Sequence, residues 1–343
     1  MKPIKLLTLA LTLTLGTAHA DDSSFADHLE WVGVAVQQNG YHVWGSSPII
    51  GEDGKTHLFC ARWPISSKFD PGWRDTSEIA HYTADSPEGP FTFSDLAIKG
   101  TGKATWDKRG YHNPVIKKVG ERYVLLFIAN DGSNPHPASQ RIGMATSKSL
   151  NGPWKKVGKD GMILAPSTDP NHWTHKARNG VNNPAFIAHP DGKFYLFYKS
   201  NKSKMGLAIA DKLEGPYLHN PKPVTDNKVG IEDGYAFLMD GKVRLLTTDN
   251  HGILRKGGGI LWTSDDGQTF NQKEKGFHLP RHYWPADFQY SPKRYYGPAE
   301  PKFERPQVLV IDGKPAYVYL PSGSSFIGSD GTCSYVLKVK PSP

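Results

Sequence analysis

Cysteine is scarce in this chain of 343 residues, which contains only Cys60 and Cys333. Two thiolates cannot form a zinc site by themselves, and no predicted helix carries a His-x-x-x-His or Glu-x-x-His motif to add further ligands. We therefore expect no metal ligands and no cofactor. The sequence does not decide whether the two cysteines form a disulfide.

Long hydrophobic runs are also missing, apart from one at the N-terminus. Lys2 and Lys5 precede the apolar stretch 6–15, and Ala18-His19-Ala20 fits the small-x-small cleavage rule. This stretch is too short to span a bilayer, and no later segment approaches the roughly 18 apolar residues of a transmembrane helix. We predict that residues 1–20 are a signal peptide. Residues 21–343 would then form one exported domain, periplasmic or secreted, without a membrane span.

Dense basic runs are absent as well, although the formal net charge is +8. An exported chain without such a run is not expected to bind nucleic acid. The excess of positive charge favours an anionic partner, such as a sulfated or uronic polysaccharide. A diffuse basic surface without a specific partner would give the same net charge.

Five polar turns recur along the chain, each followed by alternating apolar residues, and no Ser/Gly- or Pro-rich linker interrupts the repeat. The turns are Asp53-Gly54-Lys55, Gly120-Glu121-Arg122, Asp191-Gly192-Lys193, Asp240-Gly241-Lys242 and Asp312-Gly313-Lys314. Asp-Gly between apolar runs is a strong hairpin signal, because both central residues of a type I′ turn need positive φ. Their spacing of 49 to 72 residues indicates repeated sheets.

Each repeat contains more than a hairpin. A strand that usually begins with proline precedes the turn, and a third strand followed by a Gly-Pro-aromatic turn, as in Gly152-Pro153-Trp154, comes after it. Repeated four-stranded sheets around a channel form a β-propeller, so the sequence predicts an all-β, five-bladed β-propeller rather than a two-sheet sandwich. The segment 31–36 would complete the last blade beside 334–339.

The residues that begin the innermost strands should form a ring around the mouth of the channel. The sequence places one polar pair in each blade, namely Ser46 and Ser47, His112 and Asn113, Asn182 and Asn183, Glu232 and Asp233, and Glu304 and Arg305. Asn and Ser before proline are also common turn formers, so part of this ring could be structural.

Three acidic residues in this ring are candidates for catalysis. Glycosidic bond cleavage usually needs one carboxylic acid and one carboxylate, and Glu232, Asp233 and Glu304 supply three carboxyl groups from neighbouring blades. Two adjacent carboxylates also disfavour joint ionisation, which raises the pKa of one of them. His112 is a fourth catalytic candidate.

Aromatic and basic residues are concentrated at the same end of the predicted propeller. Tryptophan faces can stack on sugars, and Arg or His can hold a carboxylate or sulfate. The sequence therefore predicts an oligosaccharide or polysaccharide substrate, with these binding residues: Trp44, Ser47, Arg62, Trp63, Asn113, His175, Arg178, Asn183, His251 and Arg305.

The repeated pattern, over about residues 30–340, resembles the five-bladed propeller glycoside hydrolases of families 43 and 117. It combines a strand usually led by proline, a polar turn that is Asp-Gly-Lys in four of the five repeats, and Gly-Pro-aromatic turns. The resemblance implies an Asp base on the first blade, an Asp modulator on a middle blade and a Glu acid on a following blade. Glu232 fits the acid, or Asp233 the modulator. Ser47 and Asn183 stand where family 43 has its base and modulator. Family 117 uses a histidine acid, which adds His112, His175 and His251 as candidates.

These features predict an exported glycoside hydrolase that is exo-acting on oligosaccharides of an anionic polysaccharide. Glu232 or Asp233 would be the acid and Glu304 the base or a water-positioning group. A polysaccharide lyase and a non-catalytic carbohydrate-binding propeller are alternatives on the same fold. The sequence leaves open a structural ion held by oxygen ligands in the channel.

Overall fold

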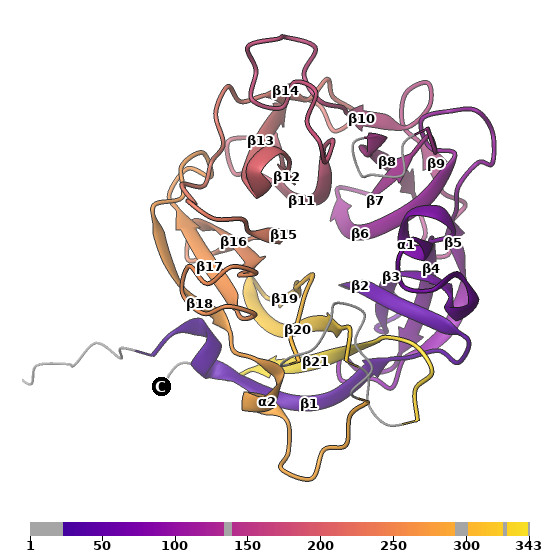
Figure 1. The fold of residues 1–343 in the computed structure, drawn as a ribbon, viewed down its shortest axis with the longest axis vertical. Coiled ribbons are helices and arrows are strands. Elements are labelled where there is room, and N and C mark those ends of the chain that lie inside the picture. The colour runs from indigo at the N-terminus through magenta and orange to yellow at the C-terminus, as the bar shows by residue number, and fades with distance from the viewer. Residues whose placement is uncertain (1–22, 134–138, 292–300, 325–327, 342–343) are drawn as a thin grey trace, which may run out of the picture.

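The computed structural model describes residues 23–133, 139–291, 301–324 and 328–341. Five β-sheets are arranged around a central channel, as Figure 1 shows, so the predicted five-bladed β-propeller is confirmed. The predicted signal peptide, residues 1–20, lies outside the described residues. Within those residues, no helix is long and apolar enough to cross a membrane.

Each blade is one antiparallel sheet whose first strand lies nearest the channel. Blade 1 comprises β2 (Tyr41–Ile50), β3 (Thr56–Pro64), β4 (Glu78–Ala84) and β5 (Thr92–Ile98). Blade 2 comprises β6 (Arg109–Val119), β7 (Arg122–Asn130), β8 (Arg141–Ser147), β9 (Lys155–Lys156) and β10 (Met162–Leu164). Blade 3 comprises β11 (Asn182–Ala188), β12 (Phe194–Lys199), β13 (Met205–Ala210) and β14 (Leu218–His219).

The last two blades complete the ring. Blade 4 comprises β15 (Glu232–Met239), β16 (Lys242–Thr248), β17 (Gly259–Ser264) and β18 (Gln272–Phe277). Blade 5 comprises β19 (Gln307–Ile311), β20 (Lys314–Ser322), β21 (Cys333–Val339) and β1 (Leu29–Val36). The helical segments are single turns: η1 (Phe25–His28), η2 (Ile65–Ser67), α1 (Gly72–Asp75), η4 (Asn201–Ser203) and α2 (Pro280–Tyr283).

Two of the four Asp-Gly turns have the type I′ geometry expected from the sequence, whereas Asp53 and Asp191 lack positive φ. Asp240 and Gly241 have φ of 53° and 71°, and Asp312 and Gly313 have φ of 51° and 75°. Positive φ at both central residues is the type I′ geometry. The Asp-Gly pattern thus sets the β15–β16 and β19–β20 hairpins.

The two ends of the chain meet in blade 5, as the sequence predicted. Strand β1 pairs antiparallel with β21, from Leu29 opposite Val339 to Val36 opposite Ser334. Ala35 and Val36 are buried with Tyr319 and Val336 in the core between blades 5 and 1. The ring is therefore closed by the first strand of the described chain, which covers the free edge of β21.

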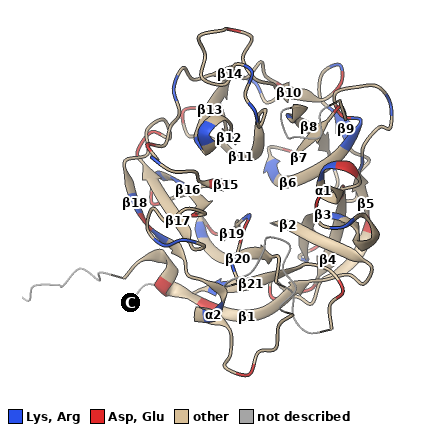
Figure 2. Cartoon of the chain, viewed as in Figure 1, with Lys and Arg blue, Asp and Glu red and all other residues tan. Residues whose placement is uncertain are grey.

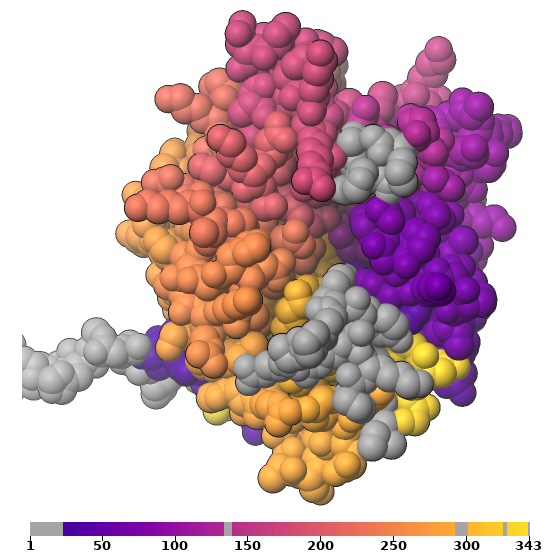
Figure 3. Space-filling model, viewed as in Figure 1, coloured from indigo at the N-terminus to yellow at the C-terminus, as the bar shows by residue number. Residues whose placement is uncertain are grey.

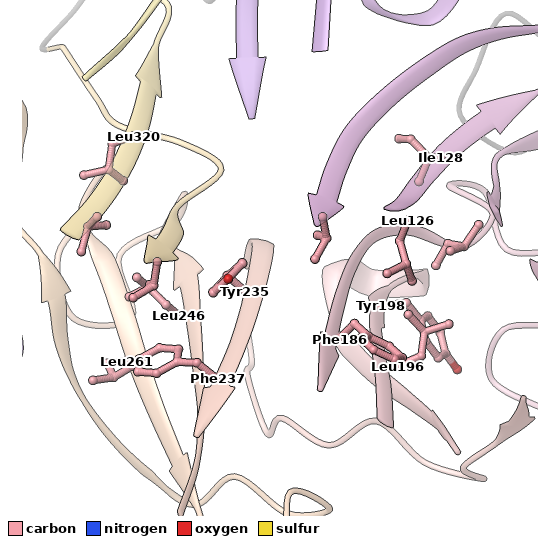
Figure 4. Packing of buried hydrophobic residues seen from close by; sticks show 14 of the residues in the cluster. Leu126, Ile128, Phe186, Leu196, Tyr198, Tyr235, Phe237, Leu246, Leu261 and Leu320 are labelled. Carbon is pink, nitrogen blue, oxygen red and sulfur yellow. The ribbon is translucent and has the colours of Figure 1, made fainter. Parts of the chain in front are cut away.

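Apolar side chains pack between neighbouring blades and hold them together. In Figure 4, Leu126 and Ile128 of blade 2 lie near Phe186, Leu196 and Tyr198 of blade 3. Such burial contributes about 25 cal/mol for each Å² of apolar surface removed from water. The radial arrangement leaves polar residues at the ends of the inner strands.

Both cysteines are buried, and neither forms a disulfide. The Cys60 thiol donates to Ser46 Oγ and the Cys333 thiol to Ser329 Oγ, each over 3.2 Å. The sequence left undecided whether the two cysteines form a disulfide, and the structure shows two separate thiols.

Candidate functional site

A cavity of about 570 Å³ lies at the mouth of the channel and is lined by residues of all five blades. Figure 3 shows a hollow at the centre of this face, between the blue-violet surface of blade 1 and the orange surface of blade 4. Eight residues predicted from the sequence line this cavity: Trp44, His112, Asn113, Asn183, Glu232, Asp233, His251 and Glu304. The structure therefore brings all four predicted catalytic residues together.

A register shift at the start of the inner strand places the ring residues. The shift falls between Glu232 and Tyr235 in blade 4 and between Asn182 and Ala185 in blade 3. The second residue of the ring pair has positive φ in four blades: Asn113, Asn183, Asp233 and Arg305. This backbone turn aims consecutive side chains in different directions.

Blade 1 differs from the alignment made on the sequence. Its register shift falls between Trp44 and Ser47, and Gly45 has φ of 60°. Trp44 and Gly45, rather than Ser46 and Ser47, are thus the blade-1 members of the ring. Ser47 lies deeper and accepts a hydrogen bond from the Ile116 amide over 3.1 Å, so it joins blade 1 to blade 2.

Hydrogen bonds connect the second ring residues of blades 2 to 5. The Asn113 amide group donates to Asn183 Oδ1 over 2.7 Å, and the Asn183 amide group donates to Asp233 Oδ1 over 2.8 Å. The Arg305 backbone N–H donates to Asp233 Oδ2 over 3.3 Å. A Cβ at Gly45 would lie 3.3 Å from both Arg305 Cγ and Asn113 Oδ1, so glycine leaves room for this chain of contacts.

Arg305 lies below the cavity and is fully buried. Its guanidinium donates to three backbone carbonyls, those of Asn113, Pro184 and Gly234, over 3.0 to 3.2 Å. A buried guanidinium needs such acceptors, because an unpaired charge is costly. The side chain therefore links three blades at the floor of the site.

Glu232 begins β15 and forms an ion pair with Lys199, which ends β12. Charged residues occur at the channel ends of these two strands in Figure 2. The Glu232 side chain is 37% exposed and the Lys199 side chain 8%. Burial raises the pKa of Glu232, but the Lys199 charge outweighs it, so the net pKa is lowered and this carboxylate is ionised.

The pKa values of Glu304 and Asp233 are shifted in the opposite direction, upward. Burial raises the pKa of Glu304 to about 7 despite the adjacent Lys302 ammonium, and the charges of Asp233 and Glu232 contribute to the rise. Burial and the Glu232 charge also raise the pKa of Asp233. The cavity thus contains one ionised glutamate beside a glutamate that can carry a proton near neutral pH.

His112 is buried, and its protonation state follows from its neighbours. The Ser77 hydroxyl donates to the Tyr111 carbonyl over 2.7 Å and lies 3.1 Å from His112 Nδ1. Because that hydroxyl has one proton, Nδ1–H must donate to it, which leaves Nε2 as an acceptor. Burial lowers the pKa of His112 to about 3, which favours a neutral imidazole in the cavity; its catalytic role stays a prediction.

Aromatic residues form the blade-1 wall of the cavity. Trp44, Phe69 and Trp73 line it, and Phe69 packs edge-to-face on Trp44 with ring centroids 5.2 Å apart. Such flat apolar faces suit the C–H faces of sugar rings. Carboxylates and lysines of blades 3, 4 and 5 line the remaining side.

Six other predicted binding residues do not line the cavity. Trp63 is fully buried beneath the aromatic wall, and Arg62 pairs with Glu78 at 2.9 Å. His175 bonds the Ser167 carbonyl, and the Arg178 backbone N–H bonds Asn201. Ser47 joins two blades, as described above. Arg305, a sixth, lies at the floor. Their binding roles stay predictions.

Several lining residues were not predicted from the sequence. Lys199 and Lys302 are counterions of the two glutamates, and Asp70 and Trp73 come from the loop between β3 and β4. Gly-Pro and Asp-Gly patterns reveal strands and turns, but they do not show which loop residue reaches the channel. Among the described residues, no group of three or more His, Cys, Asp or Glu side chains is arranged to hold a metal ion.

Solved structures of glycoside hydrolases share this fold. Zg3597, a family 117 glycoside hydrolase of Zobellia galactanivorans, superimposes with a TM-score of 0.66 at 17% identity, covering 90% of this chain and 89% of that one. A putative glycosidase of Bacteroides thetaiotaomicron gives 0.64 at 14% identity, covering 93% and 98%. An exo-1,5-α-L-arabinanase from a bovine ruminal metagenomic library gives 0.57 at 15% identity, covering 88% and 96%.

Sequence comparison gives a shorter match. An extracellular endo-α-(1→5)-L-arabinanase of Thermotoga petrophila is 27% identical over 136 residues, 36% of this chain. The match spans about a quarter (26%) of the length of that protein. No protein-family model matches the chain. The resemblance seen in the sequence is thus confirmed at the level of fold: this chain is a five-bladed β-propeller of the kind found in glycoside hydrolases of families 117 and 43.

Proposed function

We propose that this protein is a glycoside hydrolase whose active site is the cavity at the channel mouth. The observation that carries the proposal is the contrast between Glu304, whose pKa is raised to about 7, and Glu232, which Lys199 keeps ionised. A carboxyl group with a raised pKa can hold a proton for the leaving oxygen at neutral pH. Glu304 is therefore the general acid, whereas the sequence had favoured Glu232 or Asp233 for that role.

Glu232 and Asp233 support the acid in this proposal. The negative charge of Glu232 opposes ionisation of Glu304 and of Asp233. Protonated Glu304 then donates its proton to the glycosidic oxygen as the bond to the anomeric carbon breaks. The aromatic wall of Trp44 and Trp73 would hold the sugar ring against these groups.

We also propose exo action. Arg305 is fully buried between the inner strands and donates to carbonyls of blades 2, 3 and 4. A glycan chain therefore cannot pass through the propeller along its axis. A cavity with such a floor suits the end of an oligosaccharide, and the products would be released from one end.

An anionic polysaccharide as the source of the oligosaccharide, and export of the enzyme, are the remaining parts of the proposal. The net charge of +8 and the leader-like residues 1–20 support them. The two lysines of the cavity are paired with glutamates, so the anionic groups would be bound outside the cavity.

Incubation of the protein with a panel of neutral, uronic and sulfated oligosaccharides, followed by mass spectrometry, tests the proposal. We expect oligosaccharides that are shortened by one sugar unit at a time. With Glu304→Gln we expect no products. Unsaturated products absorbing in the near ultraviolet would indicate a lyase. Binding without any product would indicate a carbohydrate-binding propeller. Either result would refute the proposed hydrolase.

A further inference from the structure

The loop between β16 and β17 brings two polar side chains to the cavity. Strand β16 ends at Thr248 and β17 begins at Gly259, and no helix or strand lies between them. Asn250 and His251, near the start of this loop, line the cavity. A loop without regular structure needs other contacts to hold its side chains in one place. The residue just before them, Asp249, makes such contacts.

The Asp249 carboxylate lies inside the loop and is only 1% exposed. Its Oδ1 accepts the backbone N–H groups of Gly252 and Ile253 over 2.7 and 2.9 Å. Its Oδ2 accepts those of Leu254 and Arg255 over 2.8 and 2.9 Å. Successive N–H groups that converge on one anion form a nest. A carboxylate has acceptor sites for all four donors, whereas an amide of the same size would turn its NH2 end toward two of them.

The base of the loop is closed by backbone hydrogen bonds at the same residue. The Asp249 N–H donates to the Gly258 carbonyl over 2.8 Å, and the Gly257 N–H donates to the Asp249 carbonyl over 2.7 Å. Burial raises the pKa of the Asp249 carboxyl, but the four N–H groups outweigh it, so the net pKa is lowered and the group is ionised. The loop is therefore fixed at its base and at its centre by one residue.

The side-chain amide of Asn250 has donors to spare. Lys302 Nζ donates to Asn250 Oδ1 over 3.4 Å. An ammonium group has no acceptor, so the amide oxygen must face Lys302, and the NH2 group forms the other end. Over the described parts of the chain, no acceptor pairs with this NH2 group. Because it belongs to the cavity lining, it can donate to a hydroxyl group of a bound sugar.

His251 is placed in a similar way. Its ring lies against Gly230, where a Cβ would be 3.2 Å from His251 Cδ2 and 3.3 Å from Nε2. Glycine at this position therefore leaves room for the ring. The ring makes no hydrogen bond to another residue that the structure describes, so its nitrogens are available to sugar hydroxyl groups as well.

We propose that Asp249 is a positioning residue, which holds Asn250 and His251 where they bind hydroxyl groups of the sugar in the cavity. The inference rests on the proposed glycoside hydrolase function for its ligand, and it adds Asp249 and Asn250 to the residues predicted from the sequence. Asp249 itself does not touch the sugar. Hydroxyl contacts of this kind are present in the substrate complex and in the transition state alike, so they lower KM and leave kcat unchanged.

The first test compares Asp249→Asn with Asp266→Asn in the full chain. Asp266, in the turn between β17 and β18, also accepts backbone N–H groups, those of Gln268 and Thr269 over 2.8 and 3.3 Å, and it does not line the cavity. Both substitutions loosen a turn of blade 4. Only Asp249→Asn should raise KM for the oligosaccharides of the panel, by about 5-fold to 30-fold, the equivalent of one or two hydrogen bonds. Its kcat should stay within about twofold of the wild type.

The second test asks whether Asp249 acts through the two side chains. A chain with Asn250→Ala and His251→Ala should show a similar rise in KM. Adding Asp249→Asn to that chain should raise KM no further, because the groups that it positions are gone. A merely structural role of Asp249 would instead make the effects additive.

An unchanged KM in Asp249→Asn, or additive effects, would overturn the inference and leave the glycosidase intact. Calorimetric titration of the same variants with the same oligosaccharides separates the two proposals further. If the wild type binds a compound without cleaving it, the hydrolase is refuted, and a non-additive rise in Kd would still support the role of Asp249. If the wild type binds no compound of the panel, the proposed function and the inference both fail.

Discussion

Glu232 at the start of β15 forms an ion pair with Lys199 at the end of β12, and its negative charge helps to raise the pKa of Glu304. The pair links two blades and influences the protonation of a third. Because Glu304 must be protonated to act as an acid, activity should fall as the pH rises through about 7. The ion pair thus helps to set the upper pH limit of the enzyme.

Glu232→Gln should move this loss of activity at high pH, the basic limb of the pH profile, to lower pH. The substitution removes a negative neighbour and leaves the Lys199 charge uncompensated, and both changes favour ionised Glu304. We expect a shift of about 1 pH unit, the usual size of the effect of one nearby charge, in a profile of kcat/KM against pH. Asp75 pairs with Arg109 at 3.4 Å and does not line the cavity, so Asp75→Asn is the control and should not move the limb. An unchanged limb, or one at higher pH, would contradict this electrostatic role.

Arg305→Met should destabilise the whole propeller. It leaves the carbonyls of Asn113, Pro184 and Gly234 without their donor and removes the cation beside Asp233. Removing one partner from a buried charged network costs about 3 to 5 kcal/mol. Urea unfolding would measure the loss, with Arg178→Met, an exposed residue, as the control. A loss similar to that of the control would show that Arg305 does not hold the floor together.

His42 should make the protein sensitive to acid. Burial lowers the pKa of His42 to about 4, and its Nδ1 accepts the Thr332 N–H over 3.2 Å, which requires the unprotonated nitrogen. Between pH 6.5 and 4 the unfolded chain therefore binds more protons than the folded one. Stability should fall with decreasing pH in this window, by up to about 1.4 kcal/mol per pH unit for this histidine. Unfolding of His42→Gln at several pH values should show a smaller slope. An equal slope would exclude His42 as a source.

Removal of β1 should prevent the ring from closing. A chain that starts at residue 37 lacks the strand that pairs with β21, and the freed edge is a template for association. We expect aggregation or a large drop in melting temperature. The control is a chain that starts at residue 23 and keeps β1. A monomeric truncated chain with the control's melting temperature would show that blade 5 is stable without β1.

The fold follows from local sequence signals, whereas the site follows from them only in part. Polar hairpin turns and proline-led strands are local, so five blades and the closure of 31–36 on 334–339 could be predicted. The ring in blade 1 could not be placed, because the register shift at Gly45 is displaced from Pro48, whereas Pro114, Pro184 and Gly234 lie within the shifts of blades 2, 3 and 4. Asp70 and Lys199 reach the cavity through a packed loop and a strand end, which no short motif reveals.

Dependence of the rate on the leaving group in Glu304→Gln tests the central claim most directly. Cleavage of an oligosaccharide needs a proton on the leaving oxygen. In a 2,4-dinitrophenyl glycoside of the same sugar, the dinitrophenolate group leaves without protonation. If Glu304 is the general acid, the variant should lose about 100-fold to 10,000-fold in kcat/KM on the oligosaccharide and only a few-fold on the activated glycoside. Equal losses on both substrates would contradict the account.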